Sequence, residues 1–133
     1  MPYTYYLTDK LIDHSNGKAA YSEPVVYVGL STTTPALNGT GVTEPSTGSY
    51  ARVATSSATW NSAATGSTTN AASITFPTAT ADWAAGANLT YAVLYDASTS
   101  GNLLSYGALT AAKSCLNGDT VSISIGNLTI TLS

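Results

Sequence analysis

The last twelve residues before the C-terminal serine, Val121-Ser-Ile-Ser-Ile-Gly-Asn-Leu-Thr-Ile-Thr-Leu132, decide the fold class of this chain. Apolar and hydroxyl side chains alternate on both sides of Gly126-Asn127, a dipeptide suited to a two-residue hairpin turn. A hairpin closed at this turn places all the apolar side chains on one face. The predicted facing pairs are Ile125 with Leu128, Ile123 with Ile130 and Val121 with Leu132. Such a half-buried antiparallel hairpin predicts a β-sandwich or barrel.

Strand and turn signals recur at short intervals through the rest of the chain. The strongest central strand is expected at residues 89–95, where Tyr91, Val93 and Tyr95 share one face. Other strands are expected near residues 24–30, 50–54, 59–60, 72–76 and 102–108, with an extended stretch at 109–115 and a small-residue loop at 61–70. We therefore predict an all-β fold: an antiparallel β-sandwich, jelly-roll-like, of about eight short strands with one short N-terminal helix.

The N-terminal helix is expected from Thr4 to about Asn16. Leu7 and Leu11 recur there at helical spacing, and Gly17 is well placed as a left-handed terminator. The length of 133 residues predicts a single domain over 1–133, made of a helical segment at 1–20 and a sandwich at 24–133.

Charged residues are scarce in this chain. Four basic and seven acidic residues make up 8% of it, against roughly a quarter in ordinary soluble domains. A neutral polar surface repels its neighbours weakly and suits a protein packed in an assembly. The basic residues are scattered, so we expect no nucleic-acid partner. No stretch approaches the ~20 apolar residues of a membrane-spanning helix, and no signal sequence is evident, so we expect no membrane partner and synthesis in a cytoplasm.

His14 is the one residue that could serve as an imidazole base. Asp9 and Asp13 lie on the same expected helix, but Asp13 points to another face and Asp9 is more than a turn away. Spacing leaves a Ser-His-Asp arrangement open, because triads assemble in space. No Gly-x-Ser-x-Gly elbow is present, however, so a solvated or helix-capping role is favoured for His14.

The remaining polar residues indicate structural roles. Asp82 and Asp96 stand beside turns, where aspartate usually bonds nearby backbone, which favours turn roles over a pair of glycosidase acids. Arg52 is predicted to take part in a structural ion pair or hydrogen bond. Cys115, the only cysteine, is predicted to be a buried thiol. With no His/Cys cluster and no calcium loop, we expect a protein that is not an enzyme and has no metal or cofactor.

Two segments form the candidate contact surface. The start of the helix holds more tyrosines than one turn of a core-facing helix needs, although packing on the sandwich itself would also explain them. The loop at 31–49 is longer than usual connections and holds one charged residue, Glu44. The candidate interface residues are Tyr3, Tyr5, Tyr6, Leu7, Leu11, Pro35, Leu37 and Pro45.

Eight segments occur in one order along nearly the whole chain: Leu7-Thr-Asp-Lys-Leu-Ile-Asp-His14, Val26-Tyr-Val-Gly-Leu-Ser31, Ser49-Tyr-Ala-Arg52, Ile74-Thr-Phe-Pro77, Ala79-Thr-Ala-Asp-Trp83, Gly101-Asn-Leu-Leu-Ser-Tyr-Gly107, Gly118-Asp119 and Gly126-Asn-Leu-Thr-Ile-Thr-Leu132. Together they resemble a family of small virion proteins of tailed phages, described as tail-fibre or as head decoration (cement) proteins. The resemblance implies a structural component with no catalytic residues to carry over. The chain departs from the resemblance at two positions. Many relatives have glycine at the position of Ala84, and many have a more aromatic central strand, which here contains Leu94. We expect neither change to disrupt the fold.

Physical arguments favour capsid decoration over a fibre. The chain has neither the heptads nor the repeats of a fibre shaft. A compact subunit that binds only the assembled shell would stabilise it by mass action. We therefore expect a subunit on the capsid surface of the virion that binds the major capsid protein and itself, as a dimer or trimer. The alternative is a subunit associated with the tail or tail fibre that contacts host glycans through Trp60, Trp83 and the tyrosines.

Overall fold

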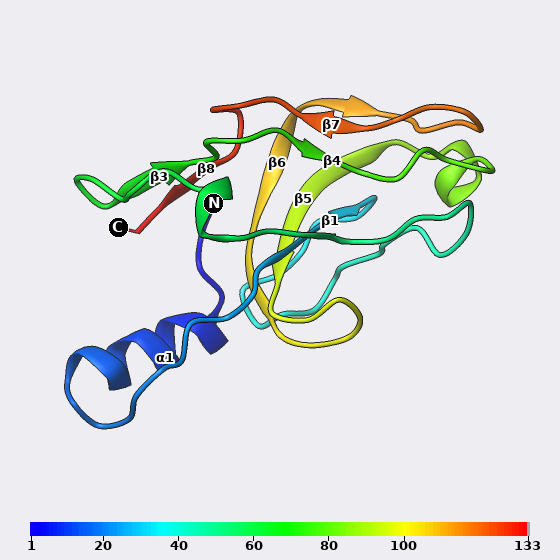
Figure 1. Cartoon of the computed structure of the whole chain (residues 1–133). Helices are drawn as coiled ribbons and strands as arrows, with labels where there is room; N and C mark the ends of the chain where they lie inside the picture. Colours follow the sequence, from blue (N-terminus) through cyan, green and yellow to red (C-terminus); the bar gives the residue numbers. More distant parts are fainter. Residues whose placement is uncertain (133) are drawn as a thin grey trace.

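The computed structural model describes residues 1–132, which form one short α-helix and eight short strands (Figure 1). The elements are α1 (Tyr5–Ser15), β1 (Tyr27–Ser31), β2 (Val53–Ala54), β3 (Ser67–Thr69), β4 (Ile74–Thr75), β5 (Leu89–Tyr95), β6 (Leu103–Lys113), β7 (Ser122–Ile123) and β8 (Thr129–Thr131), with 3-10 turns η1 (Ser57–Thr59) and η2 (Trp83–Gly86). All strand pairs are antiparallel. The prediction of an all-β antiparallel fold with one N-terminal helix is confirmed.

Four strands form the main sheet, in the order β2-β1-β5-β6. The predicted central strand is an inner strand of this sheet, β5, with Gly29 of β1 opposite Val93. The second layer consists of two separate ribbons, β3-β8 and β4-β7, where a jelly roll would have one four-stranded sheet.

The core lies between the main sheet and the two ribbons. The sheet contributes Val28, Leu30 and Leu94, and the ribbons contribute Ile74 and Ile123, all of them buried. Burying large apolar side chains from both layers removes their surface from water, which is the main force that holds such layers together.

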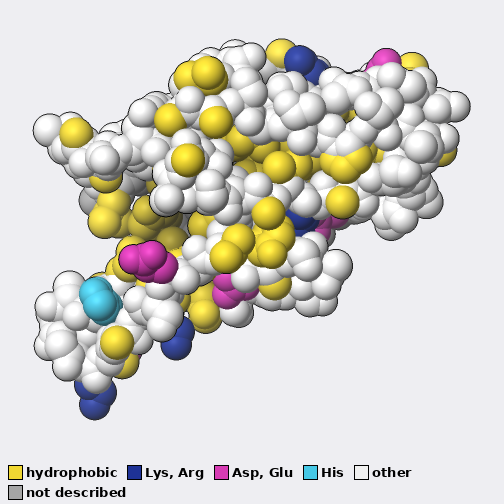
Figure 2. All heavy atoms as spheres, in the orientation of Figure 1, with side chains coloured by type: hydrophobic (Ala, Val, Ile, Leu, Met, Phe, Trp, Pro, Cys, Tyr) yellow, Lys and Arg dark blue, Asp and Glu magenta, His cyan; other side chains and the backbone are white. Residues whose placement is uncertain are grey.

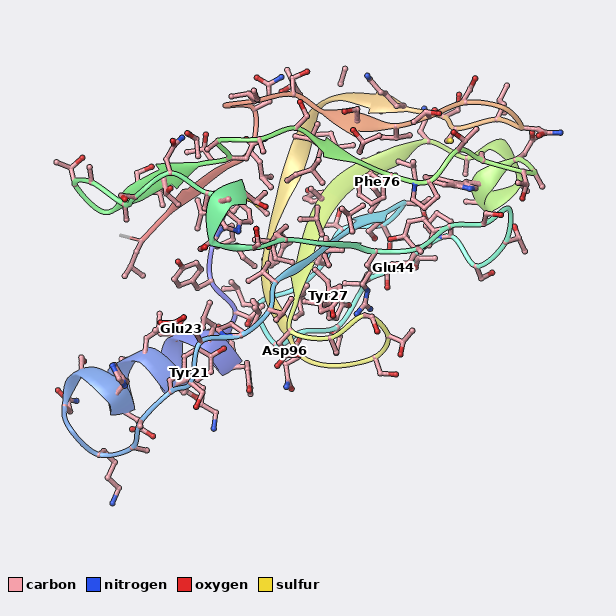
Figure 3. All side chains as sticks on the ribbon, in the orientation of Figure 1. Tyr21, Glu23, Tyr27, Glu44, Phe76 and Asp96 are labelled. Atoms are coloured by element: carbon pink, nitrogen blue, oxygen red, sulfur yellow. The ribbon has the colours of Figure 1, made fainter. Side chains whose placement is uncertain are left out.

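An aromatic cluster fills one end of this core. Phe76, which Figure 3 shows between the β4 ribbon and the main sheet, lies with its ring centroid 6.3 Å from that of Tyr50. Trp83 meets the Tyr50 ring edge-on at 5.1 Å, and its Nε1 donates to the carbonyl oxygen of Gly48 at 2.9 Å. The cluster therefore fixes the end of the 31–49 loop to the core.

The closing hairpin predicted for residues 121–132 is wrong. β7 pairs with β4 and β8 pairs with β3, so the two halves of the stretch never pair with each other. The chain does turn, but one residue earlier: Asn127 N donates to Ser124 O at 3.1 Å, and Gly126 has a φ of +80° at the third position. Ile123 and Leu128 are buried, whereas Ile125 and Leu132 are exposed.

The buried side chain of Asn70 explains this outcome. Its Nδ2 donates to Ala72 O at 2.9 Å and to Ser124 O at 3.0 Å, and its Oδ1 accepts from Leu128 N at 3.0 Å. The Asn70 carbonyl oxygen also accepts from Gly126 N at 2.9 Å. The turn is therefore bonded to Asn70, and its two arms leave toward different ribbons.

Two further local predictions were wrong, and one was confirmed. Residues 61–70 are not a loop throughout, because β3 forms there and pairs with β8, 60 or more residues away in sequence. Residues 59–60 form no strand: η1 ends at Thr59, and Trp60 makes one isolated bridge to Asn70. Gly17, after α1, has the predicted left-handed φ of +71°.

An ion pair holds the long loop against the outer face of the main sheet. Arg52 Nη2 donates to Glu44 Oε2 at 2.7 Å, and the Arg52 side chain is 6% exposed. The guanidinium lies 3.6 Å from the centroid of the Tyr95 ring, and its Nη1 donates to the carbonyl oxygens of Ala97 and Ser100 in the β5–β6 turn. The structural role predicted for Arg52 is confirmed.

Tyr50 connects this ion pair to β1. Its hydroxyl donates to Glu44 Oε1 at 2.7 Å and accepts from Leu30 N at 2.9 Å. These groups lie directly over Gly29, where a Cβ would come within 2.6 Å of Glu44 Oε1. A side chain at residue 29 would therefore displace the loop.

We expect Asn70→Ala to destabilise the protein strongly. The change removes three hydrogen bonds and leaves buried backbone groups without partners, which costs about 3 kcal/mol. Urea unfolding followed by circular dichroism measures the loss. The matched control is Asn127→Ala, at an exposed asparagine of the same turn. Equal unfolding midpoints for the two variants would contradict the role of Asn70.

Stability should fall as the pH rises above about 10, the usual pKa of tyrosine. Burial and the hydrogen bond to Glu44 raise the pKa of Tyr50, so the folded chain keeps a proton that the unfolded chain releases. Burial also raises the pKa values of Tyr3, Tyr21 and Tyr95, so Tyr50→Phe should flatten this fall without abolishing it.

Tyr50→Phe should also cost about 1–3 kcal/mol at neutral pH, because the buried Leu30 N–H loses its acceptor. The control is Tyr5→Phe, at an exposed tyrosine. Denaturant titrations between pH 7 and pH 11 test both effects, and an unchanged pH slope in Tyr50→Phe would contradict the first.

Candidate functional site

An arm projects from the β-body: α1 together with the returning segment at residues 16–25, at the lower left of Figure 1. It is attached mainly at its base, where Thr4 N donates to Leu104 O and Tyr5 N donates to Leu37 O, each at 2.9 Å. Near its tip, Tyr21 N donates to His14 Nδ1 at 3.1 Å and so ties the returning segment to the helix. The two predicted contact segments, the helix start and the long loop, therefore meet at the base of the arm.

A groove of about 260 Å³ lies between the arm and the β-body. Its lining is almost entirely apolar, although it is open at the surface. The lining residues are Tyr3, Leu7, Leu11, Tyr21, Pro24, Val26, Trp60, Thr68, Leu94, Leu104, Ser105 and Ile130. An open, concave, apolar surface of this kind is typical of a site that binds an apolar group.

Tyr21 is one of the residues that line this groove. Figure 3 shows it on the returning segment beside α1. Its hydroxyl oxygen is buried and has no hydrogen-bond partner within residues 1–132. Burial, together with the nearby Tyr6 and Asp96, raises the pKa of Tyr21, so its hydroxyl keeps its proton and stays a donor.

The structure brings some of the eight candidate interface residues together and separates others. Tyr3, Leu7 and Leu11 line the groove, although Leu7 is buried against the core. Tyr5 is 59% exposed, Tyr6 is half-buried, and Leu37 is half-buried at the base of the arm. Pro35 and Pro45 are buried within the chain's own loop packing.

The eight candidate interface residues omit four groove residues: Tyr21, Pro24, Val26 and Trp60. The glycan-binding alternative named Trp60 and the tyrosines without placing them at the arm, and it also named Trp83, which is fully buried. Tyr21 and Trp60 are 39 residues apart in the sequence, and only the tertiary fold places them together. The sequence signal for this wall is the run of apolar residues after Glu23, which the strand pattern places in the first strand at 24–30. β1 begins instead at Tyr27, and Pro24 and Val26, which precede it, line the groove.

Charged side chains gather on the arm. Five of the eleven charged residues lie between Asp9 and Glu23, and Figure 2 shows Lys, His and acidic side chains over the arm while the body is mostly neutral. On the body, Glu44 and Arg52 pair with each other. Asp96 and Asp119 accept hydrogen bonds from backbone N–H groups in their own turns, as predicted for Asp96. Asp82 was expected to do the same, but it accepts from Asn117 N, 35 residues further along the chain.

His14 and Cys115 are both held within the chain's own structure. His14 is exposed, and its Nδ1 is occupied by the Tyr21 N–H. Cys115 is buried, and burial raises the pKa of its thiol, which lowers its reactivity. Within residues 1–132, no three His, Cys, Asp or Glu side chains are placed to hold a metal ion. In the same residues no helix has the length and apolar character needed to cross a bilayer.

Comparison with known proteins gave one family. The family described as Podophage GP4 fiber I protein gp80 matches residues 2–131. No curated protein sequence matched the chain significantly. Because the family match covers nearly all of the 133 residues, it spans the arm, both ribbons and the main sheet. The chain therefore belongs to the gp80 family of podophage fibre proteins, and is a structural virion protein of a phage.

Proposed function

We propose that this chain is a structural subunit of a phage tail fibre, attached to its neighbours through the apolar groove under α1. The observation that carries the proposal is the family match over residues 2–131, because that family is described as a fibre protein. The family match supports a role in the fibre. The sequence arguments alone favour capsid decoration.

The surface chemistry supports a role in an assembly. The body offers its neighbours a surface with few charges. Beside the Glu44–Arg52 pair it carries three aspartates that accept backbone hydrogen bonds and the exposed Lys113. Contacts between such surfaces require little removal of water from charged groups, which is the main cost of burying a polar interface. The lack of heptads argues against this chain forming the shaft by itself. It does not argue against a compact subunit bound to the shaft.

The groove provides a specific place for such a contact. An apolar side chain of a neighbouring virion protein would remove the exposed surface of Leu11 and Trp60 from water. The major capsid protein is the neighbour expected under the capsid alternative.

Labelling of intact virions tests the location. Antibodies against this chain, coupled to gold, should mark the tail fibres in electron micrographs, and quantitative mass spectrometry should give a few tens of copies or fewer per virion. Label spread over the head, with hundreds of copies, would establish capsid decoration instead.

Leu11→Asp should prevent incorporation into virions, because it places a carboxylate in the apolar groove. Ile12→Asp is the matched control: it makes the same change on the next residue of α1, at a side chain 50% exposed and outside the groove lining. Both variants should stay folded. Incorporation is measured by complementing a phage that lacks the gene and quantifying the subunit in purified particles. Equal incorporation of the two variants would refute attachment through the groove.

A further inference from the structure

The outer edge of β6 is covered along its first half only. The N-terminal residues lie against it there: Tyr3 bridges Ser105, Thr4 N donates to Leu104 O, and Ser105 Oγ donates to Pro2 O at 2.6 Å. This cover ends at Gly107, where Met1 packs so closely that a Cβ would lie 2.6 Å from its Cγ. Beyond Gly107, no backbone hydrogen bond joins this edge to any residue in 1–132.

The inner edge of the same stretch is also largely unpaired. Leu89 of β5 stands opposite Lys113, and Tyr91 stands opposite Ala108. The four β6 residues at 109–112 therefore face the single β5 residue Thr90. An extended segment whose N–H and C=O groups lack ladder partners is a template for another strand.

The side chains along this edge are small and uncharged up to its end. Ala108, Thr110, Ala111 and Ala112 are exposed, and Lys113 closes the stretch. An open groove of about 430 Å³ runs beside it, with residues 107–111 on one wall and residues 121–124 and 127–129 on the other. Lys113 is the only charged residue in the lining. A strand with small neutral side chains fits this edge best.

We propose that the β6 edge at residues 108–112 pairs antiparallel with the same edge of a second copy of this chain. The sequence of the edge itself supplies the small, neutral strand that the groove fits. In an antiparallel pair centred between Thr110 and Ala111, Lys113 of one copy stands opposite Ala108 of the other. The two lysines then lie about 17 Å apart along the strands, beyond the Debye length of about 8 Å at physiological salt, so their repulsion is screened.

This pairing is independent of where in the virion the chain resides. It uses backbone hydrogen bonds at β6, whereas the proposed attachment uses apolar side chains under α1. The two proposals can therefore fail separately, and the experiment uses the purified chain alone.

Native mass spectrometry or sedimentation over a range of concentrations, combined with amide hydrogen exchange, tests the pairing. The expected result is a dimer whose formation slows exchange at residues 108–112 as the concentration rises. A chain that stays monomeric at all concentrations would overturn the proposal. So would an oligomer whose concentration-dependent protection lies in α1 or in another strand, which would indicate a different interface.

Ala111→Lys tests the contact by mutation. A lysine in the middle of an edge strand is a common natural way to prevent edge pairing. It should weaken the dimer roughly tenfold or more and remove the concentration-dependent protection. Ala63→Lys adds the same charge at an exposed alanine of a loop and should leave the dimer unchanged. Because both alanines are exposed, both variants should fold. Equal dimer affinities for the two variants would overturn the proposal.

Discussion

The second layer of this protein depends on the buried amide of Asn70. A buried amide without partners is costly, and Asn70 avoids that cost by bonding to Ala72, Ser124 and Leu128 at once. These bonds fix the turn at residues 124–127 against the end of β3. The chain on either side of the turn then pairs with β4 and with β3, which lie on opposite sides of Asn70 in the sequence. One polar side chain thus determines how two ribbons, built from four distant segments, cover the main sheet.

Charge is distributed in a way that matches this architecture. The ion pair between Glu44 and Arg52 holds the long loop against the sheet. Burial lowers the pKa of Arg52, but the hydrogen bonds and the charge of Glu44 outweigh this effect and raise it. A guanidinium that also stacks on Tyr95 and bonds two carbonyl oxygens is fixed in one position. The rest of the body surface carries only a few charges, whereas five of the eleven charged residues lie on the short arm. The body is therefore the part suited to close packing, while the arm keeps its outer side in water.

Local signals predicted the elements well and their pairing poorly. The strand at 89–95, the helix near 4–16 and its terminator Gly17 follow from side-chain periodicity and backbone preference within a few residues. The partner of each ribbon strand is more than 45 residues away, and the alternation in residues 121–132 fits a ribbon with a distant strand as well as a hairpin. The groove could not be predicted from local patterns either, because it forms between the arm and the β-body and depends on how the arm packs. Ala84, where the family resemblance suggested glycine, has a φ of +52°, a left-handed conformation that glycine adopts without strain.

The two proposed contacts differ in symmetry as well as in chemistry. Pairing of β6 with itself is isologous: each edge is used once, so the contact closes at two copies and cannot propagate. Attachment through the groove is heterologous, because the groove receives a segment that is not itself a groove. If that segment belongs to another virion protein, a β6-linked pair presents two grooves and binds two such segments at once. Binding at the second groove then occurs at the high effective concentration set by the first, so a modest apolar contact at each arm suffices for firm attachment.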